Sequence, residues 1–291
     1  NLDAIGSCTS IFTNLYLQVC TVTITVITTL TNVIALCGWV RFPPKRNLSS
    51  KVLGLSLTLS DALLVIYLTL LLGADIYTRM FINITLYWKI SVLCKVAGAL
   101  LFISIQSSIV STFLIGLDRF ICIVLRPFQR YGLSFQVALT LVLLAWIVCV
   151  LSAVAIAGVM HFNSFVSMNS ACMYFGSSLP PSILAAMLCV NTSLFLFLLI
   201  SYVCIWRIVH SSAVGTGNQQ SVQLIFNLGG IILTSLLSWL TIAIFSIMAM
   251  VGSPVFTSLE VVVGLILFPL NAFINPLLNR GWMHSFSFTT S

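Results

Sequence analysis

Charged residues are scarce in this chain. They make up 6% of its 291 residues, whereas a soluble domain carries roughly 25%, so the composition excludes a soluble globular protein. Apolar runs long enough to cross a hydrocarbon core of about 30 Å recur along the chain. Because backbone polar groups in lipid must be hydrogen-bonded within their own segment, these runs predict several membrane-spanning helices.

Groups that would carry enzymatic or light-driven chemistry are also rare. No two carboxylates share the interior of the predicted spans, and the last lysine is Lys95, so the final span has no lysine for a retinal Schiff base. The three histidines all lie near the ends of spans: His161, His210 and His284. Neither an internal repeat nor paired broken helices, which are typical of transporters, are visible. These absences argue against an enzyme, a retinal protein and a transporter.

The basic residues are distributed unevenly between the two sides of the predicted membrane. Nine of the twelve fall on one side: Arg41, Lys45, Arg46, Lys51, Arg119, Arg126, Arg130, Arg207 and Arg280. The other side carries Arg79, Lys89 and Lys95 together with Asp3, Asp75 and Glu260. This asymmetry follows the positive-inside rule and places the N-terminus outside. It also accounts for the net charge of +7 without a nucleic-acid partner, and we expect none.

The apolar runs predict an all-α membrane protein, a seven-transmembrane helix bundle. The expected spans cover roughly 17–40, 52–73, 94–124, 135–158, 180–207, 221–251 and 256–279. We expect polar loops outside at 74–90 and 159–179, and a polar connection at 211–220 inside. We expect residues 1–16 to form an extracellular juxtamembrane remnant, 17–279 the seven-helix domain and 280–291 a short cytoplasmic tail. The outer loop carries an N-glycosylation sequon at Asn83.

The third span organises the chain. A helix from Cys94 to Arg119 rises about 37 Å and crosses the membrane. It thus places Cys94 at the outer end and the Asp118-Arg119 pair at the inner interface. After Cys8, the cysteines at outer span ends or in outer loops are Cys94 and Cys172. A bridge between them would tie the second outer loop to the third helix. The alternative is two unpaired thiols at the interface.

Polar residues within the spans indicate a functional cluster, because an ionisable group in the membrane is expensive. Asp61 is the one acid deep in a predicted span. Ser108 lies about three helical turns before Arg119 and shares a face with it. Asn271 and Asn275 are i,i+4 neighbours in the seventh span. Their oxygens can form a pocket for a small hard cation such as sodium, with water. The alternative is a hydrogen-bond network without an ion; no other cofactor is expected.

With these residues in place, the chain resembles the rhodopsin-like G-protein-coupled receptors along nearly its whole length. The matching residues occur in order on seven spans: Asn32, LSLTLSD with Asp61, Cys94, Asp118-Arg119-Phe120, Trp146, Cys172, Tyr202, Trp239 and Asn275-Pro276. The resemblance implies that a heterotrimeric G protein is coupled through Asp118, Arg119 and Tyr202. It implies a conformational switch at Trp239, Asn275 and Pro276, where proline removes a helical hydrogen bond.

Within that class, the chain looks most like the leucine-rich-repeat-containing receptors for relaxin-type and glycoprotein hormones. The similarity rests on Cys8, Asp75, Tyr77, Trp88, Ser91 and Cys94, and on LDRFICIVLRPF (117–128) and VNTSLFLFLLISY (190–202). It implies a multi-pass plasma-membrane receptor in contact with lipid. It also implies a peptide or protein hormone as ligand, captured by an outer leucine-rich domain. That domain would precede Asn1 and is expected to be missing here.

Three positions depart from the family pattern. Thr241 stands where a proline usually follows Trp239, and Asn279 replaces the usual tyrosine that ends the seventh-helix motif. Ser221 stands about where some relatives place an acid that pairs with Arg119. Arg119 would then keep Asp118 as its restraint. These departures leave a second hypothesis open, a decoy or signalling-silent receptor with the same fold.

Overall fold

The computed structural model describes residues 15–41, 48–80, 88, 91–125, 132–162, 171–173, 180–216, 219–251 and 257–285. Its elements are α1 (Leu15–Arg41), α2 (Leu48–Met80), α4 (Val92–Phe120), η1 (Ile121–Leu125), α5 (Phe135–Phe162), α6 (Pro181–Thr216), α7 (Gln219–Met250) and α8 (Thr257–Ser285). The element η1 is one π-helical turn that continues α4. Across the described ranges the long elements are all helices, which confirms the predicted seven-helix bundle.

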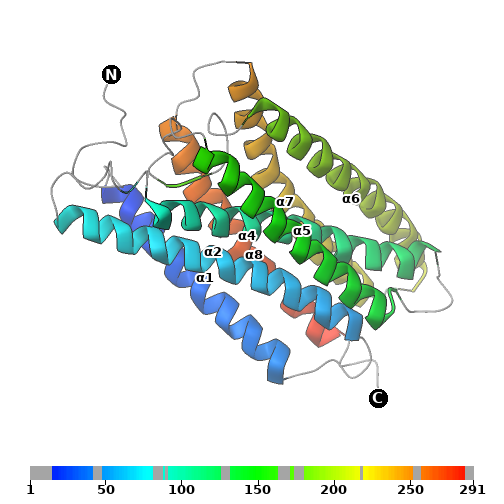
Figure 1. Ribbon diagram of the computed structural model, residues 1–291. Coiled ribbons are helices and arrows are strands. Elements are labelled where there is room, and N and C mark those ends of the chain that lie inside the picture. The colour runs from blue at the N-terminus through cyan, green and yellow to red at the C-terminus, as the bar shows by residue number, and fades with distance from the viewer. Residues whose placement is uncertain are drawn as a thin grey trace.

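The helices lie side by side, with α4 running through the middle of the bundle (Figure 1). α4 contacts α2, α5, α6 and α7, while α8 contacts α1, α2 and α7. Because neighbours surround α4, it is buried at both ends, from Cys94 to Arg119. The residues that the sequence singles out at its two ends therefore face protein rather than lipid.

The outward faces of the bundle are apolar, as a bilayer requires. In the described part of the chain, α1, α2, α4, α5, α6 and α7 are long and apolar enough to cross a membrane, and the apolar part of α8 is the shorter stretch Gly264–Leu278. Helices in lipid associate through close packing at small residues. A side chain at Gly116 of α4 would overlap Leu198 of α6, and one at Gly54 of α2 would overlap Trp39 of α1.

Several helices extend beyond the spans that apolar character predicts. The expected outer loop 74–90 is wrong in its first part, because α2 continues to Met80. The expected inner connection 211–220 is also wrong, because α6 continues to Thr216 and α7 begins at Gln219. Apolar character marks where a chain leaves the hydrocarbon, whereas a helix continues into water while its hydrogen bonds are kept.

Other sequence predictions fall outside the part that the structure describes. These are the remnant up to residue 14, which includes Cys8, the sequon at Asn83, and residues 286–291 of the tail. The side chains of Ser221 and Asn279 also lie outside it. The predictions made for these residues stay predictions.

Candidate functional site

At the outer end of α4, a disulfide joins Cys94 to Cys172, with 5.3 Å between their Cα atoms. Ser91 caps the helix here: its hydroxyl accepts a hydrogen bond from the Cys94 N–H at 3.1 Å and donates to the Trp88 carbonyl at 2.7 Å. Such a cap satisfies an N–H group that has no partner within the helix. The first turn of α4, which carries the bridge, is therefore held in place.

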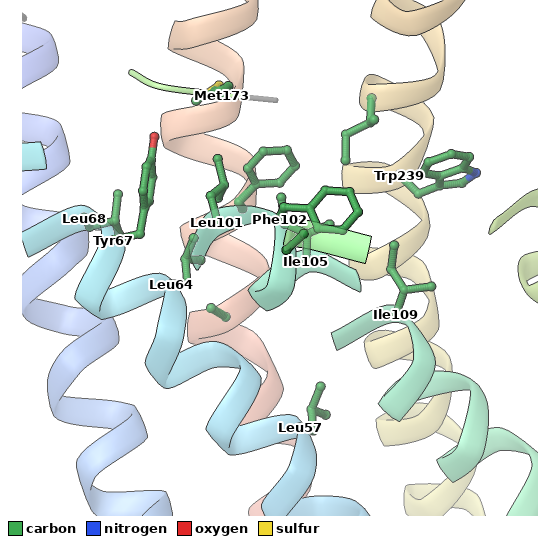
Figure 2. Close-up of a cluster of buried hydrophobic side chains, with 14 of the residues drawn as sticks. Leu57, Leu64, Tyr67, Leu68, Leu101, Phe102, Ile105, Ile109, Met173 and Trp239 are labelled. Carbon is green, nitrogen blue, oxygen red and sulfur yellow. The ribbon is translucent and has the colours of Figure 1, made fainter. Parts of the chain in front are cut away.

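The segment around Cys172 lies inside the bundle. Ala171, Cys172 and Met173 are at most 1% exposed. The Tyr67 hydroxyl of α2 donates to the Ala171 carbonyl at 2.7 Å, and a side chain at Gly264 of α8 would lie 2.7 Å from Met173 Cε. Figure 2 shows Met173 at one end of the apolar cluster, and the Tyr67 hydroxyl points toward this same end. This outer-loop segment thus contacts α2, α4 and α8 at once.

Below this cluster, the structure brings together the four polar residues that the sequence places in a pocket. Asn275 Nδ2 of α8 donates to both carboxylate oxygens of Asp61, at 3.3 and 3.2 Å. A cavity of about 30 Å³ lies beside them, and its lining includes Asp61, Ser108, Asn271 and Trp239. The Asn271 Oδ1 accepts a hydrogen bond from the Ser235 hydroxyl of α7 at 3.3 Å.

Two oxygen atoms of this cluster lack a protein partner. Among the described residues, neither the buried Ser108 hydroxyl nor Asn275 Oδ1 makes a hydrogen bond. Buried polar atoms are normally satisfied by protein or by ordered water. A cavity of this size has room for about two water molecules. Carboxylate, hydroxyl and amide oxygens are also the ligands that hard cations prefer. The site is therefore chemically suited to water and to a small cation.

Asn32 of α1 fastens α8 at the point where Pro276 interrupts it. Pro276 has no N–H to donate to the carbonyl four residues earlier, which belongs to Ala272. Asn32 Nδ2 donates to this carbonyl at 3.1 Å, and to the Thr28 carbonyl at 3.0 Å. The spacing of Pro276 and Ala272 is a sequence signal that predicts a carbonyl in need of a donor. It does not say which helix supplies one.

Sequence reasoning missed two buried polar links to α4. The Trp146 indole N–H donates to the Ser56 hydroxyl at 3.0 Å, and this hydroxyl lies 2.8 Å from that of Ser111. The amides of Gln106 and Asn191 exchange two hydrogen bonds between α4 and α6, at 3.0 and 3.4 Å. Buried amides and indoles require partners. The sequence therefore indicates that such links exist, although not where they run.

At the inner end of α4, Arg119 and Asp118 are 4% and 3% exposed. Arg119 Nη2 lies 3.6 Å from Asp118 Oδ2 and donates to the Ser50 hydroxyl of α2 at 2.8 Å. Asp118 Oδ1 accepts a hydrogen bond from the Leu133 N–H at 2.8 Å. A side chain at Gly132 would overlap the Asp118 carboxylate. Both charged groups are thus enclosed by protein.

This geometry extends the expectation that Asp118 restrains Arg119 at the inner interface. The pair is buried, and Ser50 supplies a second restraint. The sequence does not reveal Ser50, which lies 69 residues from Arg119. The contact depends on how the inner end of α2 packs against α4, and apolar patterning does not determine this.

The expected switch residue Trp239 and the expected coupling residue Tyr202 lie on neighbouring helices. Trp239 of α7 is 4% exposed, and its ring stacks on that of Phe195 of α6, with 6.3 Å between centroids. Tyr202 of α6 is half-buried, and its hydroxyl lies against the backbone of Gly229 in α7. Both aromatic residues thus lie where α6 and α7 meet, one near the Asp61 cavity and one nearer the inner end.

The sequence of this chain is similar to those of known proteins. The family described as "7 transmembrane receptor (rhodopsin family)" matches residues 31–278. Relaxin receptor 1 of Homo sapiens is 24% identical over 293 residues, which cover 96% of this chain and 38% of the relative. The "Probable glycoprotein hormone G-protein coupled receptor" of Anthopleura elegantissima is 24% identical over 284 residues, 95% and 30% of the two chains. This chain thus spans less than two fifths of the length of these relatives.

The family match extends over most of the chain, from the first helix to the last. The bundle, the Cys94–Cys172 bridge and the buried Asp118-Arg119 pair lie within the matched region. The chain therefore belongs to the rhodopsin family of seven-transmembrane receptors, as a multi-pass, non-enzymatic receptor of the plasma membrane.

Proposed function

We propose that this chain is the membrane part of a receptor that passes a peptide or protein-hormone signal to a heterotrimeric G protein. The hormone class is supported by the names of its relatives, relaxin receptor 1 and a probable glycoprotein hormone receptor. The proposal includes the upstream leucine-rich, hormone-capturing domain that the sequence resemblance implies; this chain spans 38% and 30% of the length of those relatives.

The outer end supports a ligand that acts on the loops rather than one that enters the bundle. Met173 and its two preceding residues pack over the apolar cluster (Figure 2). A displacement of this segment would act on α4 through the disulfide and on α2 through the Tyr67 hydrogen bond. A large ligand or outer domain that contacts the loop thereby has two mechanical links to the helices.

The observation that carries the coupling proposal is the enclosure of Arg119 at the inner end. Its guanidinium is held by Asp118 and Ser50, through contacts that can break without unfolding either helix. A signal that favours a second helix arrangement needs to bind only that arrangement more tightly. Signalling is then a population shift that releases Arg119 toward a G protein at the inner face.

Replacing Arg119 with alanine is expected to abolish coupling. Membranes from cells that express the chain are mixed with purified G protein, and nucleotide exchange is measured without hormone. Wild type is expected to exceed empty membranes, while Arg119→Ala returns to their level. Arg41→Ala is the control, because Arg41 is exposed at the inner end of α1; it should leave exchange unchanged.

One observation favours the signalling-silent receptor as a second candidate. α7 is a continuous α-helix through Thr241, whose hydroxyl donates to the Leu237 carbonyl at 3.0 Å. The proline that usually bends this helix in the family is absent. Surface-expressed wild type with exchange equal to empty membranes, for each G-protein class, would contradict coupling and favour this candidate.

We also propose that the cavity beside Asp61 binds sodium. Sodium at ten times its Kd would stabilise the folded state by about 1.4 kcal/mol. The thermal unfolding temperature of the purified chain should then rise by about 3–6 °C in sodium chloride relative to choline chloride at equal ionic strength.

Asp61→Asn should remove this difference between the two salts. Asp75→Asn should keep it, because Asp75 lies nearer the outer end of α2, away from the cavity, where its carboxylate accepts a hydrogen bond from Gln18 at 3.2 Å. Equal unfolding temperatures of the wild type in both salts would contradict sodium binding and favour the alternative, a hydrogen-bond network without an ion.

A further inference from the structure

Gly229 lies within α7, close to the ring of Tyr202 of α6. A Cβ atom at position 229 would lie 2.6 Å from the Tyr202 hydroxyl oxygen and 2.9 and 3.1 Å from two ring carbons. Contacts below about 3 Å do not fit within van der Waals radii. The tyrosine ring therefore occupies space that any other residue at position 229 would fill.

The position of Gly229 is unfavourable for the helix itself. It lies in the interior of α7, next to a second glycine, Gly230, and glycine is a poor helix former. Neither residue is at a helix end or a turn, where glycine would be useful for its backbone freedom. What position 229 provides is a notch, defined here as the space left by the missing Gly229 side chain.

The notch holds Tyr202 by shape. Among the described residues, the Tyr202 hydroxyl makes no hydrogen bond, and its oxygen lies 2.6 Å from the place that a Cβ of residue 229 would take. A ring held only by van der Waals contact leaves when the opposite wall moves away. Separation of the inner parts of α6 and α7 would therefore release Tyr202 without first breaking a hydrogen bond.

We propose that Gly229 is the positioning residue for Tyr202: its notch seats the ring in the resting arrangement and releases it when α7 moves away from α6. The inference rests on the proposed coupling to a G protein, for which Tyr202 supplies a hydroxyl in the rearranged inner face. It assigns α7 a contact with α6 as its resting restraint, in addition to the Arg119 contacts between α4 and α2.

Gly230 provides a matched control one residue further along. A Cβ there would lie 2.7 Å from Cδ1 of Leu278 in α8, the flexible tip of a side chain, and not near Tyr202. Gly230→Ala gives α7 the same gain in helix propensity as Gly229→Ala. A difference between the two variants therefore reports the contact with Tyr202.

The experiment is a double-mutant cycle on the full chain, with Gly229→Ala, Tyr202→Ala, both together, and Gly230→Ala. Gly229→Ala is expected to lower the thermal unfolding temperature by about 3–6 °C, because overpacking displaces the ring. In the Tyr202→Ala background, where the ring is absent, the same substitution should not lower the unfolding temperature. An equal loss of unfolding temperature on Gly229→Ala in both backgrounds would contradict the proposal that the notch seats Tyr202.

Nucleotide exchange on purified G protein tests the consequence. Gly229→Ala should raise basal exchange about fivefold over wild type, because Tyr202 starts outside its seat, whereas Gly230→Ala should match wild type. The increase should vanish in the Tyr202→Ala background. Unchanged exchange in Gly229→Ala, in a chain whose exchange depends on Arg119, would overturn the role in coupling.

Two further results separate the notch from the proposed function. If wild type drives no exchange, the coupling proposal fails, and the thermal cycle alone decides whether the notch seats Tyr202. If Gly229→Ala does not reach the cell surface, Tyr202→Ala is added, which removes the hydroxyl and both ring carbons that lie close to the new Cβ. Recovery of surface expression by this pair supports the notch, and failure to recover, with Tyr202→Ala alone expressed normally, contradicts it.

Discussion

Replacing both Cys94 and Cys172 with serine is expected to lower the thermal unfolding temperature by about 5–10 °C and to reduce surface expression severalfold. A disulfide stabilises mainly by constraining the unfolded chain, typically by about 2–4 kcal/mol, and this one closes a loop with a sequence separation of 78. Helices α4 and α5 lie within that loop. Residual helix in the unfolded state reduces the chain entropy that the bridge removes, so we expect a stabilisation in the lower part of this range of free energies.

A second contribution comes from the segment that the bridge holds. Without it, the segment keeps the packing of Met173 against α8 and the hydrogen bond from Tyr67 to Ala171, but loses its covalent link to α4. Cys37→Ser is the matched control, because Cys37 is a free, exposed cysteine of α1. Unfolding is followed on purified protein and expression on intact cells. A double variant as stable as Cys37→Ser would show that the bridge does not stabilise the receptor.

Replacing Asp118 with alanine is expected to raise basal nucleotide exchange at least about tenfold. Arg119 would remain 4% exposed but without its counter-charge, and breaking a buried ion pair in this way costs about 3–5 kcal/mol. The guanidinium can avoid this cost by moving toward water at the inner face, which is the arrangement that the proposed coupling requires. A change of about 1.4 kcal/mol already shifts the populations tenfold.

Two conservative variants separate the effects of this substitution. Asp118→Asn keeps an oxygen that can accept the Leu133 N–H and removes only the charge, so it should retain most of the increase in exchange. Ser50→Ala removes a hydrogen bond to a charged group, worth about 1.5–3 kcal/mol, and should give a smaller increase. Adding Arg119→Ala should return each variant to the level of empty membranes. Basal exchange equal to wild type in both Asp118→Asn and Ser50→Ala would show that these contacts do not restrain the receptor.

The sequence by itself determined the number and order of the helices, and it predicts their orientation in the membrane. Membrane thickness and the fixed rise of a helix convert an apolar run into a span. The same rise converts the separation of Cys94 and Arg119 into opposite ends of one helix, and basic residues mark the inner side. Residue types also indicated which polar groups need partners: Asp61 within its span, and the carbonyl that Pro276 leaves without a donor.

Only the tertiary structure decided which of these groups meet. Asp61 and Asn275 are 214 residues apart, and Arg119 reaches Ser50 of α2, which is 69 residues away in the sequence. Tyr202 lies in the notch at Gly229, although nothing in the local sequence of either helix pairs them. In lipid the outer faces of all helices are similarly apolar, so hydrophobicity says little about how each helix is rotated. Rotation and contact are set by close packing at small residues and by the pairing of buried polar groups, both of which depend on all seven helices at once.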